Sequence, residues 1–137
     1  MGTDSFVLHF NELSSFERGG GVKTTPLIKK FPVVEGITTG ITRFPAGLKV
    51  PLHYHNCAEQ VTVLGGEAEA EIDGAHFKMG PLDTTFVTAG KPHRFTNVGS
   101  TTMTILWIYG ASEVTRTFVD SGETVDHLSA KDVGVTR

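Results

Sequence analysis

Apolar and polar residues alternate along much of this chain, in short runs that glycine and proline interrupt. The clearest run is Glu67–Ile72, where three glutamates alternate with two alanines and an isoleucine. A period of two places each set of side chains on its own face of a β-strand. The pair Asp73-Gly74 comes next and favours a two-residue hairpin turn with positive φ. Ala75–Met79 is therefore predicted as the returning strand.

Other segments of similar character predict further strands. No segment sustains an apolar period of 3.6 residues, so helix is expected only in short pieces, at Asn11–Arg18 and Ser129–Val133. The other predicted strands are Phe6–Phe10, Val22–Lys30, Thr38–Phe44, Leu52–His55, Glu59–Leu64, Thr84–Thr88, His93–Asn97, Thr102–Tyr109 and Val114–Val119. About ten short antiparallel strands with turns at this spacing favour an all-β sandwich or jelly-roll barrel.

The length of 137 residues fits one domain spanning the chain, which can bury a core without disulfides. We expect the barrel core at about residues 38–110, with N-terminal strands before it and a polar tail after it. The net charge is −3, and the largest basic cluster is the pair Lys29-Lys30, so nucleic acid is not an expected partner.

Two features bear on location. No apolar run approaches the roughly 20 residues that a membrane span needs, so a membrane partner is not expected. The N-terminus lacks the pattern of a signal peptide, and Cys57 is the only cysteine. A single cysteine cannot form an intramolecular disulfide, which fits a reducing compartment. The expected location is therefore cytoplasmic.

Candidate chemistry is concentrated in residues 47–66. His53 and His55 lie two residues apart, and Glu59 follows four residues after the second histidine. On a strand, the two imidazoles would project from one face about 6.6 Å apart, close enough to converge on one ion. Nitrogen and oxygen donors together suit iron, manganese, zinc, nickel or copper better than calcium or magnesium. His93 is the candidate for a further ligand from elsewhere in the chain.

Two motifs resemble those of the cupin family. The pattern Gly47-x5-His53-x-His55-x3-Glu59-x6-Gly66 fills every position of the first motif, and Asp83, Gly90, His93 and Asn97 match the second. Leu82 and Thr88 stand where that second motif usually has glycine and proline. The resemblance implies a cupin-type jelly-roll barrel with one divalent metal inside it. Its ligands would be His53, His55, Glu59 and His93.

Side chains near such an ion are harder to assign. The apolar candidates for a pocket wall, each equally explicable as barrel core, are Phe44, Val61, Phe86, Phe95, Trp107 and Tyr109. Arg94 alternates with His93 and should point outward, whereas Arg43 is ambiguous. Candidates for orienting the imidazoles are Thr42, Thr62, Thr88 and Asn97. His9, His76 and His127 lie outside both motifs and are expected at the surface, and Cys57 should point away from the ligand face.

The resemblance leaves the activity open because one fold hosts many reactions. The favoured hypothesis is an enzyme acting on an oxygen-rich small molecule, either a dioxygenase or an isomerase or lyase working through an enolate, with Glu59 doubling as a base. The alternative is a small-molecule binder or sensor with a structural metal. A metal-free sugar epimerase of this fold would need a histidine–aspartate pairing that the sequence does not show. A homodimer is expected, with Phe6–Phe10 or Val22–Lys30 free to pair with a neighbouring copy.

Overall fold

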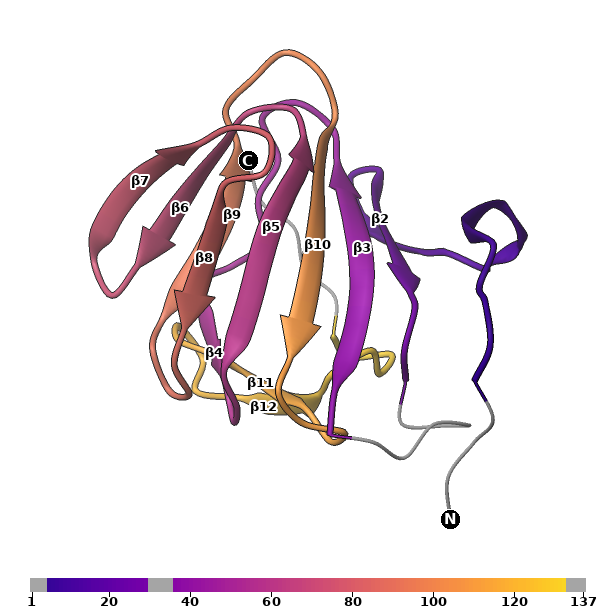
Figure 1. Ribbon diagram of the computed structural model, residues 1–137. Coiled ribbons are helices and arrows are strands. Elements are labelled where there is room, and N and C mark those ends of the chain that lie inside the picture. Colours follow the sequence, from indigo (N-terminus) through magenta and orange to yellow (C-terminus); the bar gives the residue numbers. More distant parts are fainter. Residues whose placement is uncertain (1–4, 30–35, 133–137) are drawn as a thin grey trace.

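Two six-stranded antiparallel sheets form the body of the protein (Figure 1). The computed structural model describes residues 5–29 and 36–132. One sheet has the order β1-β2-β3-β10-β5-β8, and the other has the order β12-β11-β4-β9-β6-β7. Between β3 and β11 the chain crosses from one sheet to the other after every strand except in the β6–β7 hairpin, which is the arrangement of a jelly roll. The all-β jelly-roll prediction is therefore confirmed.

The elements follow the predicted pattern closely. They are a 3₁₀ turn η1 (Phe10–Glu12) and the strands β1 (Phe16–Gly19), β2 (Val22–Pro26), β3 (Thr38–Phe44), β4 (His53–His55), β5 (Glu59–Gly65), β6 (Ala68–Ile72), β7 (Ala75–Met79), β8 (Thr84–Val87), β9 (His93–Asn97), β10 (Met103–Tyr109), β11 (Thr115–Phe118) and β12 (Thr124–Asp126). The alternating burial of β10, with every second residue buried, shows why a period of two was informative.

The predictions for the two ends of the chain need correction. Phe6–Phe10 is not a strand: its residues are exposed, Phe10 is the first residue of η1, and the sheet edge belongs to β1. Asn11–Arg18 is not a helix, because only the single turn η1 forms before β1. The polar tail contains an unforeseen strand, β12, and residues 129–132 form turns rather than helix. Lys30 and Val133, the predicted ends of two segments, lie outside the described residues.

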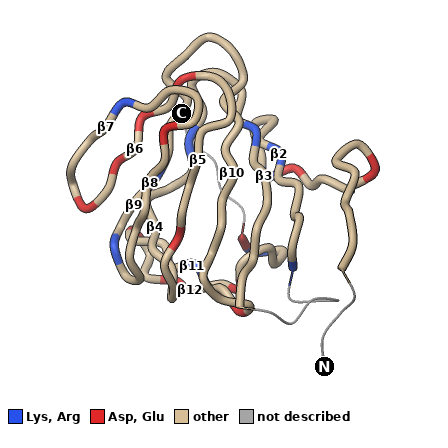
Figure 2. The backbone as a smooth tube through the Cα atoms, viewed as in Figure 1, with Lys and Arg blue, Asp and Glu red and all other residues tan. Residues whose placement is uncertain are grey.

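The hairpin of β6 and β7 illustrates how local sequence sets the geometry. Ala68 and Ala70 are buried, whereas the glutamates between them are partly exposed. Asp73 and Gly74 have φ values of 50° and 86°, as the predicted turn requires. Figure 2 shows acidic positions along β6 and at the turn, and a basic position on β7. Within the described residues, no helix is long and apolar enough to cross a membrane.

Leu82 marks a departure from the second cupin motif with a physical cost. Its φ is 75°, in the left-handed region that glycine tolerates and leucine does not. The conformation costs roughly 1–2 kcal/mol for a residue with a Cβ atom. The turn is nonetheless held, because the Leu82 amide donates to the Val63 carbonyl at 2.6 Å. The loop therefore keeps its shape despite the substitution.

Gly40 determines how closely the core packs on β3. It pairs with Trp107 of β10, and a Cβ atom at Gly40 would lie 2.2 Å from a carbon of the indole ring. Trp107 is 4% exposed and has its Nε1–H donated to the Thr42 hydroxyl at 2.9 Å. The ring therefore has little freedom to retreat.

We expect Gly40→Ala to lower the free energy of unfolding by about 1–3 kcal/mol, the usual cost of overpacking a core. Urea unfolding followed by tryptophan fluorescence measures this directly. Gly36→Ala is the matched control, since a Cβ atom there meets nothing within 4 Å. Equal unfolding midpoints for the two variants would contradict this account of the packing.

Candidate metal centre

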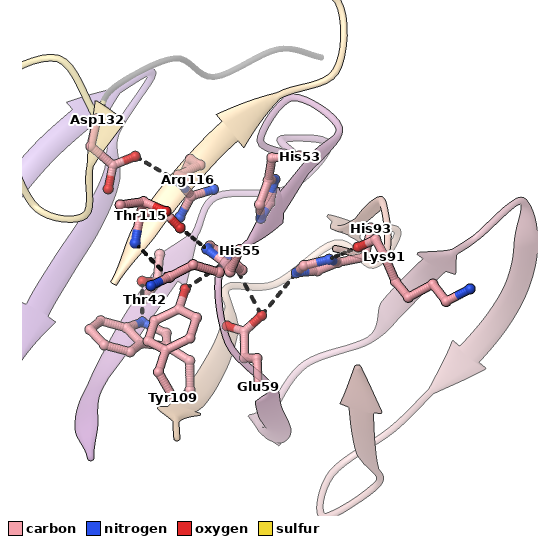
Figure 3. A network of polar contacts seen from close by, with 12 residues as sticks. Thr42, His53, His55, Glu59, Lys91, His93, Tyr109, Thr115, Arg116 and Asp132 are labelled. Atoms are coloured by element: carbon pink, nitrogen blue, oxygen red, sulfur yellow. Dashed lines mark hydrogen bonds and ion pairs between the residues drawn. The ribbon is translucent and has the colours of Figure 1, made fainter. Parts of the chain in front are cut away.

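Three histidines converge from two strands inside the protein (Figure 3). His53 and His55 lie on one face of β4, and His93 opens β9 directly opposite His53. Their exposed fractions are 3%, 2% and 1%. One ring nitrogen from each lies within 4.8 Å of the others. Strand pairing therefore brings together imidazoles 40 residues apart in sequence.

Backbone carbonyl groups fix the orientation of all three rings. The Nδ1–H groups donate to Pro51 O at 2.7 Å for His53, to Thr115 O at 3.0 Å for His55 and to Lys91 O at 2.8 Å for His93. A neutral imidazole that donates through Nδ1 keeps a lone pair on Nε2. Each histidine is thus held in the tautomer that ligates through Nε2. The threonine and asparagine side chains considered from the sequence are not these partners.

Glu59 completes the cluster from the start of β5. It is 5% exposed, and its Oε1 lies 2.9 Å from His93 Nε2 and 3.7 Å from His55 Nε2. Because the Nδ1 atoms carry the ring protons, the Nε2 lone pairs of His55 and His93 face the negatively charged carboxylate of Glu59. These contacts are repulsive. A cation resolves that conflict, either a proton on an imidazole or a metal ion among all the donors. The donor set therefore fits a divalent transition metal.

The environment lowers the pKa values of three of the candidate donors, His53, His55 and Glu59. Burial, with the charge of Arg116, lowers the pKa of His53 well below its ordinary value. Burial also lowers the pKa of His55 to about 3, although Glu59 opposes the shift. For Glu59, burial alone would raise the pKa. The close contact with His93 Nε2 and the neighbouring imidazoles outweigh it, so the net shift is downward. All of these shifts favour the metal-binding forms.

A small cavity of about 30 Å³ adjoins the cluster, with His53 and Glu59 in its wall. Of the six predicted pocket residues, four line it: Phe44, Phe95, Trp107 and Tyr109. Val61 is fully buried in the core but is not part of this wall. The assignment of Phe86 was wrong, because its side chain is 68% exposed on the outer face of β8. The Tyr109 hydroxyl lies 3.3 Å from His55 Nε2.

Charged residues that sequence reasoning missed also line this cavity. Arg18 and Arg116 are 6% and 3% exposed, and both form ion pairs with Asp132, at 3.0 and 2.7 Å. Asp132 itself is completely buried. Nothing in the local sequence singles out these three residues, since their meeting depends on the pairing of β11 with β4 and on the path of the tail.

His127 also differs from expectation. It was placed at the surface, but its ring packs edge-on against Trp107 and Tyr109, with centroids 5.0 and 4.8 Å apart. It lines the small cavity and also a larger outer recess of about 530 Å³. Its pKa falls to about 3, through burial and the nearby charge of Arg116. His9 and His76 are exposed, as expected.

The remaining candidates lie away from the cluster. Arg94 donates to Glu71 at 2.9 Å on the outer face of the second sheet. The Arg43 guanidinium stacks over the Phe10 ring, 5.5 Å from its centroid. Cys57 is half-buried and is not among the clustered donors of the described residues. Neither arginine considered from the sequence therefore serves the cavity.

The family model for the cupin domain matches residues 40–109. This match spans about half of the chain and contains all four candidate ligands, and the chain belongs to the cupin family. No curated protein sequence matches it.

Solved structures share the fold. A predicted oxalate decarboxylase from Thermotoga maritima superposes with a TM-score of 0.71 at 24% identity, covering 77% of this chain and 99% of that one. An RmlC-like cupin from Shewanella frigidimarina gives 0.68 at 18% identity, covering 81% and 95%. KdgF from a Halomonas species gives 0.66 at 17% identity, covering 79% and 94%. At these identities the likeness establishes the fold, and the reaction has to be argued from the site.

The lowered histidine pKa values predict that acid destabilises the metal-free protein. His55 and His127 have pKa values of about 3 in the fold, against an ordinary value of 6.5. Their stabilising contribution is complete above pH 6.5 and is lost as the pH falls toward 3. Each contributes a slope of up to about 1.4 kcal/mol per pH unit in that window.

Chemical unfolding of the chelator-treated protein at several pH values between 7 and 4 measures this slope, and His127→Asn should reduce it. His76→Asn is the control, because it removes an imidazole that is 55% exposed on β7. A wild-type slope in the His127→Asn variant would contradict the assignment.

Proposed function

We propose that this protein is a metal-dependent enzyme that acts on a small, oxygen-rich molecule. The observation that carries the proposal is the cluster of three buried Nε2 atoms and the Glu59 carboxylate, with each imidazole held by a backbone carbonyl group. His53, His55, Glu59 and His93 are the proposed ligands. Solved structures of similar fold include one titled a predicted oxalate decarboxylase, which is consistent with chemistry on small oxygen-rich acids in this fold.

A divalent ion held by four protein groups would supply Lewis-acid polarisation of a substrate oxygen, or dioxygen chemistry if the ion is iron or copper. The chain contributes the rest. Phe44, Phe95 and Trp107 exclude bulk water from the cavity wall. Glu59 is the residue placed to accept a proton on Oε1, since it is the only carboxylate of the described residues in direct contact with the imidazoles. The two reaction classes proposed are oxygenation and enolate-based isomerisation or elimination.

A non-catalytic role is the second candidate, because the cavity beside the cluster measures only about 30 Å³. A structural metal or a tightly enclosed small ligand would fit such a space. Metal analysis followed by oxygen uptake with diketones, catechols and keto acids separates the two roles. Turnover of any member of this panel favours the enzyme, and a tightly bound metal without turnover favours the binder.

His53→Ala should lower both metal content and any activity, because it removes one ligand from the centre of the cluster. Elemental analysis of protein purified without an affinity tag, with activity measured on the same sample, provides the test. His76→Ala is the matched control, since His76 is exposed and its ring nitrogen pairs with Glu69. Full metal occupancy in His53→Ala would contradict the proposed ligand set.

We also propose that the protein forms a homodimer in the cytoplasm. Apolar side chains gather on the outer side of β2 and β3, where Phe6, Leu8 and Phe10 are 48%, 38% and 37% exposed around a recess of about 400 Å³. Burying such a surface against a second copy would be favourable. Sedimentation at micromolar concentration should give twice the mass of the chain. Phe6→Asp should shift the equilibrium toward monomer, whereas Phe86→Asp, exposed on β8, should leave it unchanged.

A further inference from the structure

Arg116 brings an incompletely paired guanidinium group into the cavity beside the metal cluster. It lies on β11 directly opposite His55 of β4, so both side chains project to the same face of the sheet. Figure 3 shows Arg116 between Asp132 and His53. The side chain is 3% exposed, yet its Nη1 has no hydrogen-bond partner among the described residues. A buried donor left without an acceptor is unfavourable, and more so when it is charged.

The charges around the cavity also favour an anion, because positive charge is in excess there. Two buried arginines, Arg18 and Arg116, share the single carboxylate of Asp132. Glu59 carries the only other negative charge lining the cavity, and a divalent ion at the proposed centre would more than neutralise it. Positive charge therefore exceeds negative charge once the metal is bound. Uncompensated buried charge is costly, and an anionic ligand relieves it.

The dimensions of the cavity restrict the anion. A volume of about 30 Å³ admits a planar group of a few atoms. Arginine presents its N–H groups in a flat fork that matches a carboxylate. His127 forms part of the wall of both this cavity and the outer recess, so a larger ligand would pass this ring. A terminal carboxylate is the anionic group that best fits both the fork and the space.

We infer that Arg116 is a binding residue for the carboxylate of the substrate or ligand, which it holds next to the metal centre. Arg18 lies beside it, and the two arginines share the carboxylate of Asp132. The inference rests on the proposed function for the metal, but the arginine site itself is built from residues of this chain. It narrows the substrate class from oxygen-rich molecules in general to small carboxylic acids.

Isothermal titration of the full chain with formate, acetate and oxalate tests the inference, using both zinc-loaded and metal-free protein. Arg116→Gln should weaken binding of the tightest of these anions at least tenfold without lowering metal content. Arg116→Lys keeps the charge but loses the fork, so we expect a smaller loss of about three- to tenfold. Arg94→Gln is the matched control, because Arg94 pairs with Glu71 away from the cavity.

Asp132→Asn separates binding from a purely structural role. Because it frees the arginines from the carboxylate that they share, the variant should bind the anion more tightly, although its unfolding midpoint falls. If Arg116→Gln and Asp132→Asn both lower the unfolding midpoint and leave the anion affinity unchanged, Arg116 is structural and the inference is wrong. Should Arg116→Gln fail to fold, Arg116→Lys and Asp132→Asn still decide the question.

The remaining outcomes test the arginine site and the proposed metal-dependent function separately. Inorganic phosphate should bind more weakly than the carboxylates, and tighter binding of phosphate through Arg116 would overturn the assigned class. A protein that binds no metal but binds carboxylate through Arg116 would contradict the proposed function and support the arginine site. A protein that binds metal but no carboxylate would support the proposed metal site and contradict the arginine site.

Discussion

The candidate site depends on three buried imidazoles and a carboxylate that face one another. Each Nδ1–H is committed to a backbone carbonyl, so every Nε2 presents a lone pair toward the same space as Glu59. In a buried setting, such a group of acceptors is unfavourable unless a cation occupies it. His53 and His93 use carbonyls two residues earlier in their own loops, whereas His55 uses Thr115 of β11. Three separate segments must therefore assemble before the site exists.

A second group of charged residues lies beside the first, and an anion rather than a cation would stabilise it. Arg18, Arg116 and Asp132 leave an excess of positive charge next to a centre that is itself suited to a cation. Burial lowers the pKa values of His53, His55 and His127, and the positive charge of Arg116 lowers them further. The chain thus lowers the pKa values of His53, His55 and His127 without a metal, and it would gain from an anion when a metal is bound. These two tendencies make the cavity suited to a metal and an acid together.

Sequence reasoning found what local patterns encode. Spacing placed His53 and His55 on one strand face, and alternation found most strands of the core, because both depend on neighbours a few residues apart. It failed for residues whose position depends on contacts with residues far away in the sequence. Arg18 and Asp132 lie 114 residues apart in sequence, and the position of His127 depends on how the tail folds back over β10. Phe6–Phe10 has the composition of a strand but pairs with no strand of residues 5–29 and 36–132.

The site residues that the sequence predicted lie inside the segment matched by the family model, and those that it missed lie outside that segment. His53, His55, Glu59 and His93 all fall within residues 40–109, the part that the cupin model covers. Arg18, Arg116, His127 and Asp132 all fall outside it, yet they line or support the same cavity. The shared part of the fold thus holds the proposed metal ligands, and the flanking segments hold the charged residues that we propose bind an anion beside them. For a family whose members share a barrel and differ in chemistry, specificity in this chain is best sought in residues 114–132 rather than among the ligands.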